Sequence, residues 1–319
     1  MRADVSSRRL AVVTVSYNSS DVLTGYLDSL SDGLAGVDNC EIVVADNASS
    51  DGSADVAEAH PLRPRVVRTG RNGGYSAGIN AAVATTGPDS DILILNPDIR
   101  LLPGTAARLL DELADSSVGV AVPKIFNEDG SIARSVRREP SLSTIWSDSL
   151  LGTKISSSLG LGELVATPDL YRIGGAIDWA TGAALLVSAR ARAAVGAWDE
   201  SFFLYSEEVD YLRRVRDHGF SVRLVPDAQC VHIGGAYHEN VQLSALMTRN
   251  RIRYFRRHHG RLATAMYRSG LLVEGGLRYV LGPGHRAAFH AALTTVATSS
   301  ERPAGAGGFA RLADEGSGS

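Results

Sequence analysis

An aspartate at the end of an apolar run has the type and position most suited to chemistry. Asp98 follows the run Asp91–Leu95 and the turn residues Asn96 and Pro97. A carboxylate in a turn stiffened by proline can hold Mg²⁺ or Mn²⁺, because these hard cations take oxygen ligands and share them with phosphates. Such a cation would neutralise the charge that builds on a departing nucleoside diphosphate. Asn-Pro-Asp is also a common turn, so a merely structural role stays open.

A glycine-rich stretch is the second feature. Arg71–Asn80 contains three glycines and leads into a helical pattern. Backbone N–H groups at the start of a helix can face an anion. The spacing matches neither a Walker A loop nor G-x-G-x-x-G, which argues against a P-loop or a dinucleotide site. A plain tight turn is the alternative.

An acidic helix start and a late histidine complete the reactive residues. Glu207, Glu208 and Asp210 open a predicted helix, where the helix dipole alone favours acids, but a carboxylate there can also take a proton from an attacking hydroxyl. At about 100° per residue, Glu207 and Asp210 share a face and Glu208 points elsewhere. His232 follows a strand, and imidazole suits Mn²⁺ better than Mg²⁺. A lone histidine is more often packed or on the surface, and the two local sequences do not establish that His232 meets Asp98.

The elements that must position these residues alternate between strand and helix. Strands are predicted at Leu10–Val15, Glu41–Ala45, Arg65–Arg68 and Asp91–Leu95, with helices after Asn18-Ser19-Ser20, from Ser53 through His60, and from Pro103 to Asp115. This alternation predicts βαβ units and a mostly parallel sheet, in which ligands lie at the carboxyl ends of the strands. Polar clusters stand at three such ends: Tyr17-Asn18, Asp46-Asn47 and Asn96-Pro97-Asp98.

The rest of the chain is less regular. Residues 140–170 have weak periodicity and are expected to form a variable, partly mobile segment near the substrate. Residues after 240 have a helical pattern, and residues 299–319 are rich in Ala, Gly and Ser and are predicted to be disordered. Other predicted elements are strands at Val118–Phe126, Ala183–Ser188 and Ser221–Val225, a hairpin turn at Asn127–Gly130, and helices at Ala189–Val195 and Ser206–His218.

Composition narrows the class of protein. The 319 residues are 44% apolar and 21% charged, which is typical of a globular protein. A net charge of −3 argues against a general nucleic-acid binder. Cys40 and Cys230 have no metal-binding spacing and are expected to be structural thiols in a reducing cytoplasm. Neither a signal peptide nor a membrane span is predicted, so we expect a cytoplasmic protein with at most peripheral attachment to the inner face of a membrane.

Taken jointly and in order, several of these stretches resemble the family 2 glycosyltransferases of GT-A fold, especially their bacterial rhamnosyltransferase-like branch. The resemblance covers about residues 9–240. It implies a Rossmann-like α/β fold with a mostly parallel central sheet, helices on both faces and a C-terminal helical extension. The implied parts are a glycosyltransferase domain at 1–240, with a nucleotide-sugar half at about 9–126 and an acceptor half at about 127–240, and an extension at 241–298. The matching stretches are Val12–Asn18, Asp46–Ser53, Arg71–Asn80, Leu95–Asp98, Asp178–Ala184 and Gly196–Asp210.

The resemblance also assigns roles to residues. Asp98 matches the family's metal-binding aspartate and His232 its later metal-site histidine, with Mg²⁺ or Mn²⁺ as the cofactor. The base is expected at Glu208, with Glu207 as the second choice and Asp210 on sugar hydroxyls. Trp179, Thr181 and Gly182 match the turn beside the acceptor. The nucleotide and donor sugar are expected to contact Ser16, Tyr17, Asn18, Asp46, Arg71, Asn72, Gly74, Gly78, Asn96 and Asp98, with Asn96 acting through water.

The function implied is an inverting, metal-dependent transfer of rhamnose or a similar hexose from a dTDP- or UDP-linked donor. The acceptor would be a hydroxyl of a glycan, a lipid-linked saccharide or a secondary metabolite, as in cell-wall or polysaccharide biosynthesis. A nucleotidyltransferase and a non-catalytic carbohydrate- or partner-binding domain remain the alternatives. The arginines of Arg249–Arg261 are interpreted as a solvated helix face packed through Ile252, Tyr254 and Phe255, or as a surface for anionic lipid head groups.

Overall fold

A nine-stranded sheet forms the centre of the computed structural model, which describes residues 8–234 and 241–295. The strand order is β3-β2-β1-β4-β10-β6-β11-β5, and β8 pairs with β11. Six strands run in one direction and β5, β8 and β10 oppose them, so the sheet is mostly parallel, as predicted. The strands are β1 (Leu10–Ser16), β2 (Cys40–Asp46), β3 (Arg65–Arg68), β4 (Asp91–Leu95), β5 (Ile99–Leu101), β6 (Val118–Asn127), β8 (Gly175–Ile177), β10 (Ala184–Val187) and β11 (Ser221–His232), with a separate pair of β7 (Val136–Arg137) and β9 (Trp179–Ala180).

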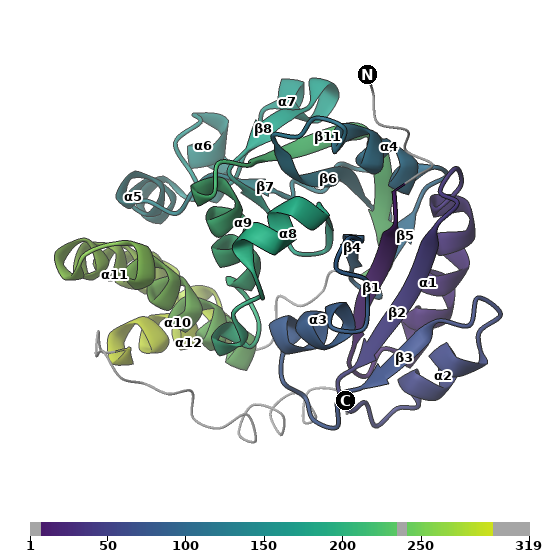
Figure 1. Ribbon diagram of the computed structural model, residues 1–319. Helices are drawn as coiled ribbons and strands as arrows, with labels where there is room; N and C mark the ends of the chain where they lie inside the picture. The colour runs from purple at the N-terminus through teal and green to yellow at the C-terminus, as the bar shows by residue number, and fades with distance from the viewer. Residues whose placement is uncertain (1–7, 235–240, 296–319) are drawn as a thin grey trace.

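Helices cover both faces of the sheet because alternate strand residues are apolar on each side (Figure 1). One face packs on α1 (Ser20–Gly33), α2 (Ser53–Ala59) and α4 (Thr105–Glu112). The other packs on α3 (Tyr75–Val83), α8 (Ala189–Val195) and α9 (Glu207–Asp217). Helix α1 follows the carboxyl end of β1, where the predicted polar cluster Tyr17-Asn18 stands.

The segment 140–170 contains helices, although its weak periodicity predicted none. It contains α5 (Leu142–Leu151) and α6 (Thr153–Ser158), and α7 (Pro168–Ile173) follows. Ser141 caps α5, because its hydroxyl accepts from the Thr144 amide and the Thr144 hydroxyl accepts from the Ser141 amide. This Ser/Thr capping box is a local signal that weak apolar periodicity conceals.

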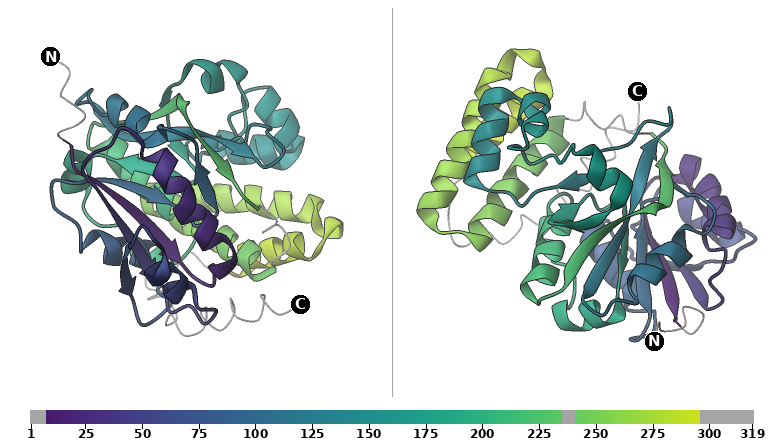
Figure 2. Two further views of the ribbon diagram at one scale, coloured as in Figure 1. Left: turned by 90° about the vertical axis from the view of Figure 1, so that its right-hand side faces the viewer. Right: turned by 90° about the horizontal axis from the view of Figure 1, so that it is seen from above.

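The C-terminal helices pack together with α5 rather than on the sheet alone. They are α10 (Val241–His258), α11 (Arg261–Leu277) and α12 (Pro283–Thr294), with a short 3₁₀ turn, η4 (Tyr279–Leu281), between the last two. A small third core joins Ile145 of α5 to Ile252, Phe255, Tyr267 and Leu271. Figure 2 shows this group of helices beside the sheet rather than over it.

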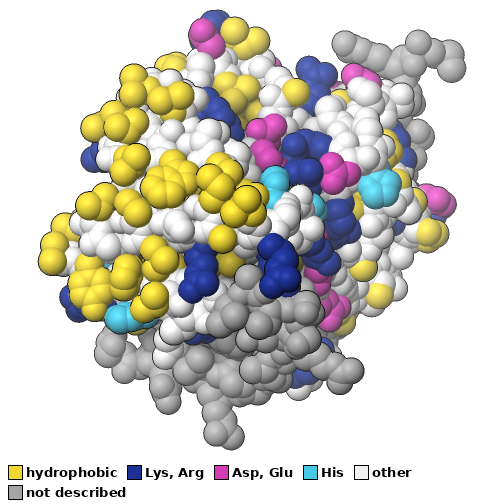
Figure 3. Space-filling view, turned by 90° about the vertical axis from the view of Figure 1, so that its left-hand side faces the viewer, with side chains coloured by type: hydrophobic (Ala, Val, Ile, Leu, Met, Phe, Trp, Pro, Cys, Tyr) yellow, Lys and Arg dark blue, Asp and Glu magenta, His cyan; other side chains and the backbone are white. Residues whose placement is uncertain are grey.

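Exposed apolar side chains are unevenly distributed over the molecule. Residues 8–131, all of them described, contribute no exposed large apolar side chain, whereas α5, α6 and the C-terminal helices contribute most of them. Figure 3 shows hydrophobic side chains spread over this face and basic side chains along its border. Within the described ranges, no helix has both the length and the apolar character needed to cross a bilayer.

Candidate active site

Asp98 and His232 meet at the edge of the sheet although 134 residues separate them. The chain turns after β4 into β5, and β11 pairs with β5 so that His232 lies opposite Ile99. This register brings Nε2 of His232 to 3.0 Å from Oδ2 of Asp98. Hydrogen bonding to the carboxylate raises the pKa of His232. The short strand β5 was not predicted, and it is the element that makes the contact.

The other carboxylate oxygen of Asp98 is available for a ligand. Asp98 is 8% exposed, and its Oδ1 is buried without a hydrogen-bond partner among the described residues. A buried, unpartnered carboxylate oxygen is costly unless a cation or donor completes it. In the described ranges, no cluster of three or more His, Cys, Asp or Glu side chains forms a closed metal site. One carboxylate and one imidazole fit a divalent cation that takes its remaining ligands from substrate phosphates and water.

The carboxyl ends of β1 and β2 lie side by side. Ser16 stands opposite Asp46 in the parallel register, and Ser16 Oγ and Asp46 Oδ1 are both buried without a partner among the described residues. The second oxygen of Asp46 accepts from the Ser49 amide at 3.2 Å. Asn18 has a φ of 48°, and its side-chain oxygen accepts from the Ser50 amide at 2.9 Å. Tyr17 lies between Ser16 and Asn18, half-buried at the same edge.

The glycine-rich loop is held against the start of α9. Gly74 has a φ of +89°, and a Cβ built on it would stand 2.2 Å from the carbonyl oxygen of Phe203. Glycine is therefore required at this approach. Asn72 accepts from the Gly74 amide at 3.1 Å. Gly78 lets α3 lie against Val15 of β1, while Arg71 is exposed.

Three non-glycine residues with positive φ precede the acidic pair. Phe203, Tyr205 and Ser206 have φ values of 59°, 69° and 70°. Such conformations persist only when surrounding contacts hold them, and they are common at functional sites. The buried amide of Asn250 in α10 donates to the carbonyls of Phe202, Leu204 and Tyr205. Sequence reasoning missed this residue, whose only local signal was a polar side chain on the packed side of an arginine-rich helix.

The two glutamates at the start of α9 have distinct environments. Glu207 is 4% exposed, whereas Glu208 is half-buried. One oxygen of each, Oε2, is buried without a partner among the described residues. Burial raises the pKa of Glu208 to about 7, and burial plus repulsion by Glu208 raises the pKa of Glu207 well above its usual range. Close to neutral pH, Glu208 is thus the more readily deprotonated of the two.

The turn at 181–183 stands beside Glu208. A Cβ on Gly182 would lie 3.5 Å from Cβ of Glu208 and 3.5 Å from the Tyr75 ring. The Tyr75 hydroxyl donates to the Gly182 carbonyl at 2.9 Å. Burial raises the pKa of the Tyr75 phenol, as do the nearby charges of Glu207, Glu208 and Asp98. Tyr75 therefore stands near all three carboxylates and links the glycine-rich loop to the Gly182 turn.

Two predicted site residues have their polar atoms engaged inside the protein. Trp179 is 7% exposed, and its Nε1 donates to the Arg138 carbonyl at 2.8 Å. Asp210 is fully buried and ion-paired with Arg214 at 2.9 Å and Arg257 at 3.1 Å, and Nε2 of His258 lies 3.3 Å from its carboxylate. Asp210 thus joins α9 to α10.

Arg137 is a basic residue of the site that sequence reasoning did not single out. It lies on β7 opposite Trp179, and its guanidinium lowers the pKa of Glu208. Burial lowers the pKa of the Arg137 guanidinium below its usual value, although Glu163, Tyr171 and Glu208 oppose this shift. Its side-chain hydrogen bonds are to backbone carbonyls, those of Arg134 and Val136. Arg137 is therefore a half-buried cation near Glu208, with no carboxylate among its hydrogen-bond acceptors in the described residues.

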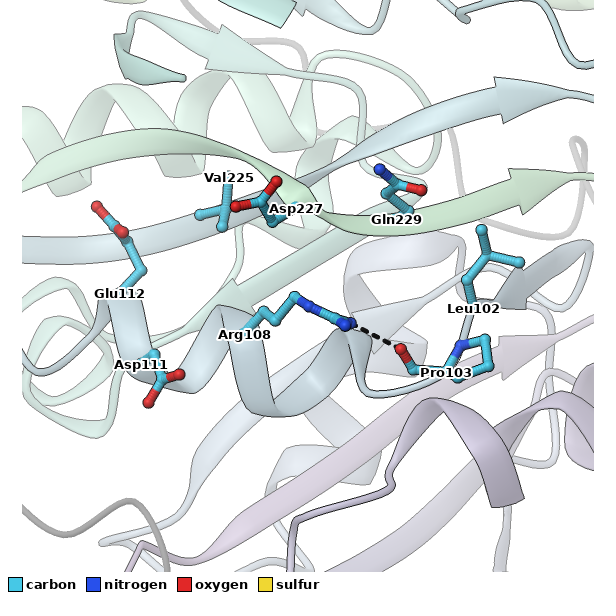
Figure 4. A pocket seen from close by; sticks show the side chains of 8 residues that line it. All are labelled: Leu102, Pro103, Arg108, Asp111, Glu112, Val225, Asp227 and Gln229. Atoms are coloured by element: carbon cyan, nitrogen blue, oxygen red, sulfur yellow. Dashed lines mark hydrogen bonds between the residues drawn. The ribbon is translucent and has the colours of Figure 1, made fainter. Parts of the chain in front are cut away.

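A surface groove elsewhere on the molecule does not belong to this site. It lies between α4 and β11 and is lined by acidic side chains, Arg108 and several apolar residues, without any of the predicted site residues (Figure 4). Arg108 donates to the Pro103 carbonyl at 2.7 Å.

Known glycosyltransferases resemble the chain in sequence and in fold. The family described as Glycosyl transferase family 2 matches residues 11–168. An N-acetylglucosaminyl-diphospho-decaprenol L-rhamnosyltransferase of Mycobacterium tuberculosis is 31% identical over 237 residues, covering 70% of this chain and 75% of that protein. Rhamnosyltransferase WbbL of Escherichia coli is 23% identical, covering 72% and 84%. A mannosyltransferase of Pyrobaculum calidifontis, solved with GDP-Man and Mn²⁺, has a TM-score of 0.55 at 20% identity and covers 98% of this chain and 81% of that one.

Proposed function

Because the chain belongs to glycosyl transferase family 2 and is a rhamnosyltransferase-like glycosyltransferase of GT-A fold, we propose that it transfers a hexose such as rhamnose from a dTDP- or UDP-linked donor. The acceptor proposed is a sugar hydroxyl of a lipid-linked saccharide, with inversion at the anomeric carbon. The name of the mycobacterial relative supports both choices, since it specifies rhamnose and a diphospho-decaprenol acceptor. The nucleotidyltransferase and binding-domain alternatives are not favoured.

Glu208 is the base in this proposal. It is half-buried beside Gly182, so an acceptor hydroxyl can reach it, and its pKa of about 7 allows it to accept a proton at neutral pH. Glu207 is more deeply buried and holds its proton more strongly, because its pKa is raised further. Glu207 is therefore proposed as a neutral neighbour that limits the charge in the pocket.

Asp98 and His232 would hold the divalent cation. Their 3.0 Å contact across 134 residues, with a buried and unpartnered Oδ1, is the observation that carries the proposal. When bound, Mg²⁺ or Mn²⁺ would supply neutralisation of the diphosphate leaving group. Asn96 is proposed to contact this region through water.

The donor would occupy the edge formed by β1, β2 and the glycine-rich loop. Asp46 has a buried acceptor oxygen suited to a pyrimidine imide N–H. Ser16, Tyr17 and Asn18 are proposed to line the base and ribose. Arg71, Asn72, Gly74 and Gly78 are proposed to lie over the ribose and donor sugar.

The acceptor side is proposed to comprise Thr181, Gly182, Glu208 and Arg137. Trp179 and Asp210 serve in this proposal as supports, because their polar atoms already bind within the protein. The proposed division keeps a glycosyltransferase domain at 1–240 and a helical extension at 241–298. The region 299–319, for which disorder was predicted, lies outside the described residues.

A nucleotide-sugar turnover assay tests the proposal. Purified protein is incubated with dTDP-rhamnose or a UDP-hexose and a lipid-linked N-acetylglucosaminyl acceptor, with Mn²⁺ or with EDTA, and the released nucleoside diphosphate is measured. We expect transfer that needs Mn²⁺ and the intact Asp98. Release of pyrophosphate from a nucleoside triphosphate, or equal turnover in EDTA, would contradict the proposed reaction.

A further inference from the structure

The corner where α5 and α6 meet the end of α11 exposes several large apolar side chains. Arg278 joins the two parts, since it donates to the Asp148 carbonyl at 2.9 Å and lies 3.8 Å from a Cβ built on Gly152. The most exposed apolar side chains around it are Leu150 at 63%, Ile155 at 54%, Leu277 at 63%, Val280 at 86% and Leu281 at 69%. We call these five residues the apolar corner. Single exposed apolar side chains are ordinary, but a gathered set on one face marks a binding surface.

Charge on the same helices is strongly one-sided. Residues 241–295 contain nine arginines, one glutamate and no lysine or aspartate, a formal charge of +8 in a chain whose total is −3. Figure 3 shows basic side chains bordering the apolar face. Lys154 of α6, next to Ile155 in the sequence, is exposed, and so is Arg286 in the first turn of α12, five residues after Leu281. An apolar surface with a basic border is suited to a partner that is apolar within and anionic at its surface.

The arginines of Arg249–Arg261 largely make contacts within the protein. Arg251 pairs with Glu163 at 3.1 Å, and Arg257 pairs with Asp210 at 3.1 Å. Arg253 donates to the Ser201 carbonyl. Much of Arg249–Arg261 therefore holds α10 against the rest of the protein, and Ile252, Tyr254 and Phe255 are buried as the alternative interpretation expected.

From this placement we propose that the apolar corner, together with the exposed Lys154 and Arg286 of the adjoining helices, docks onto the surface of an anionic lipid bilayer. A second copy of the chain is the less suitable occupant. Residues 241–295 keep a positive formal charge even after Arg251 pairs with Glu163 and Arg257 with Asp210, and a self-complementary contact would bring two such groups together. An anionic lipid surface is attracted by the same charge. The inference does not depend on the proposed sugar transfer, since docking needs no donor or acceptor.

Vesicle co-sedimentation of the full chain tests the docking. Phosphatidylcholine vesicles with and without phosphatidylglycerol are the probes, and we expect binding to the anionic vesicles that weakens as salt is raised. The double variant Val280→Glu/Leu281→Glu should bind the anionic vesicles at least about tenfold more weakly. It removes apolar contact with the bilayer and adds repulsion from the anionic lipids. The double variant Ile132→Glu/Ile173→Glu is the matched control, because it makes the same charge change at exposed apolar positions on other parts of the surface.

The outcomes separate the alternatives. Loss of vesicle binding in the corner variant but not in the control supports the proposal. Equal binding by both variants, or no binding of the natural protein to anionic vesicles, overturns it. A concentration-dependent dimer in light scattering that the corner variant abolishes, without vesicle binding, would assign the corner to a second copy instead. Sugar transfer measured with a water-soluble acceptor should be unchanged in the corner variant, which keeps this test apart from that of the proposed function.

Discussion

The side-chain amide of Asn250 donates to the carbonyl of Leu204 at 2.8 Å, and this contact joins the C-terminal helix α10 to the loop before the acidic pair. The same amide also reaches the carbonyls of Phe202 and Tyr205. Phe203, Tyr205 and Ser206 have positive φ values in this loop, so it needs support from outside. The helical extension therefore holds the segment that presents Glu207 and Glu208.

Replacing Asn250 with alanine is expected to lower kcat more than it changes KM for the donor. The variant removes the donor that orders the loop, at a cost of about 1–3 kcal/mol in the free energy of unfolding. Steady-state kinetics and thermal unfolding measure the two effects. Thr248→Ala is the control, because Thr248 is also buried on α10 but its hydroxyl binds within the helix to Ser244. Equal losses of kcat in both variants would contradict a specific role for Asn250.

Turnover should depend on the ionisation of Glu208. A base must be deprotonated, so kcat/KM is expected to rise as the pH rises through about 7. Glu208→Gln should lower kcat by about 10²- to 10⁴-fold, as for loss of a positioned base. Glu207→Gln mimics the protonated acid that Glu207 is expected to be, so its loss of kcat should be much smaller than that of Glu208→Gln. A variant Glu208→Gln with nearly natural turnover would reject this base.

The raised pKa of Glu208 also predicts how stability depends on pH. The pKa of Glu208 is higher in the folded protein than in the unfolded chain. Its favourable contribution to the free energy of unfolding is therefore complete at a pH below the usual pKa of glutamate and is lost as the pH rises through about 7. Glu208→Gln cannot ionise and lacks this loss. Its Tm relative to the natural protein should therefore increase between about pH 5 and about pH 9 in thermal unfolding. A difference in Tm that stays constant across this range would contradict the assigned pKa.

Arg137 should set the position of the activity profile along the pH axis. Its positive charge lowers the pKa of Glu208, so Arg137→Gln should move the rising limb of kcat/KM to higher pH. Arg137→Lys keeps the charge and should keep the limb in place. A purely structural role would reduce activity at every pH without moving the limb.

Binding of a nucleoside diphosphate should require Asp98 when Mn²⁺ is present. Calorimetry with Mn²⁺ is expected to show that Asp98→Asn binds dTDP or UDP more weakly than the natural protein does. EDTA should reduce the affinity of the natural protein to that of the variant. Asp111→Asn is the matched control, since Asp111 lies in the unrelated groove of Figure 4. If Asp98→Asn still bound with unchanged Mn²⁺ dependence, the cation would be held elsewhere.

Gly74→Ala is expected to displace the glycine-rich loop from the start of α9. The new Cβ would lie 2.2 Å from the Phe203 carbonyl oxygen, in addition to the cost of about 1–3 kcal/mol for a backbone region that essentially only glycine populates, with φ at +89° and ψ at 178°. Gly52→Ala is the comparison for a positive φ without a clash, because Gly52 has a φ of +83° in the left-handed helical region and open space around it. Both variants should lose stability, and only Gly74→Ala should also raise KM for the donor sugar.

Much of the fold could be predicted because its signals are local. The apolar runs of β1 and β4, the Gly219 stop after α9 and the Ser188 cap of α8 are all encoded within a few neighbouring residues. The polar clusters that directly follow predicted strands also indicated which residues stand at the carboxyl ends of those strands. The helices within residues 140–170 were not predicted, because they bury mainly small and polar side chains and so show little apolar periodicity.

The strand–helix alternation, the family resemblance and the chemical types at the predicted site can all be recognised in the amino-acid sequence. Three contacts could be seen only in the folded chain: β5 brings Asp98 to His232, Arg137 stands near Glu208, and Asn250 holds the loop before α9. These contacts join residues far apart along the chain, and their geometry follows from strand register and helix packing. A local pattern fixes whether a segment becomes a strand or a helix, but the partner it meets depends on how all the segments bury their apolar faces together.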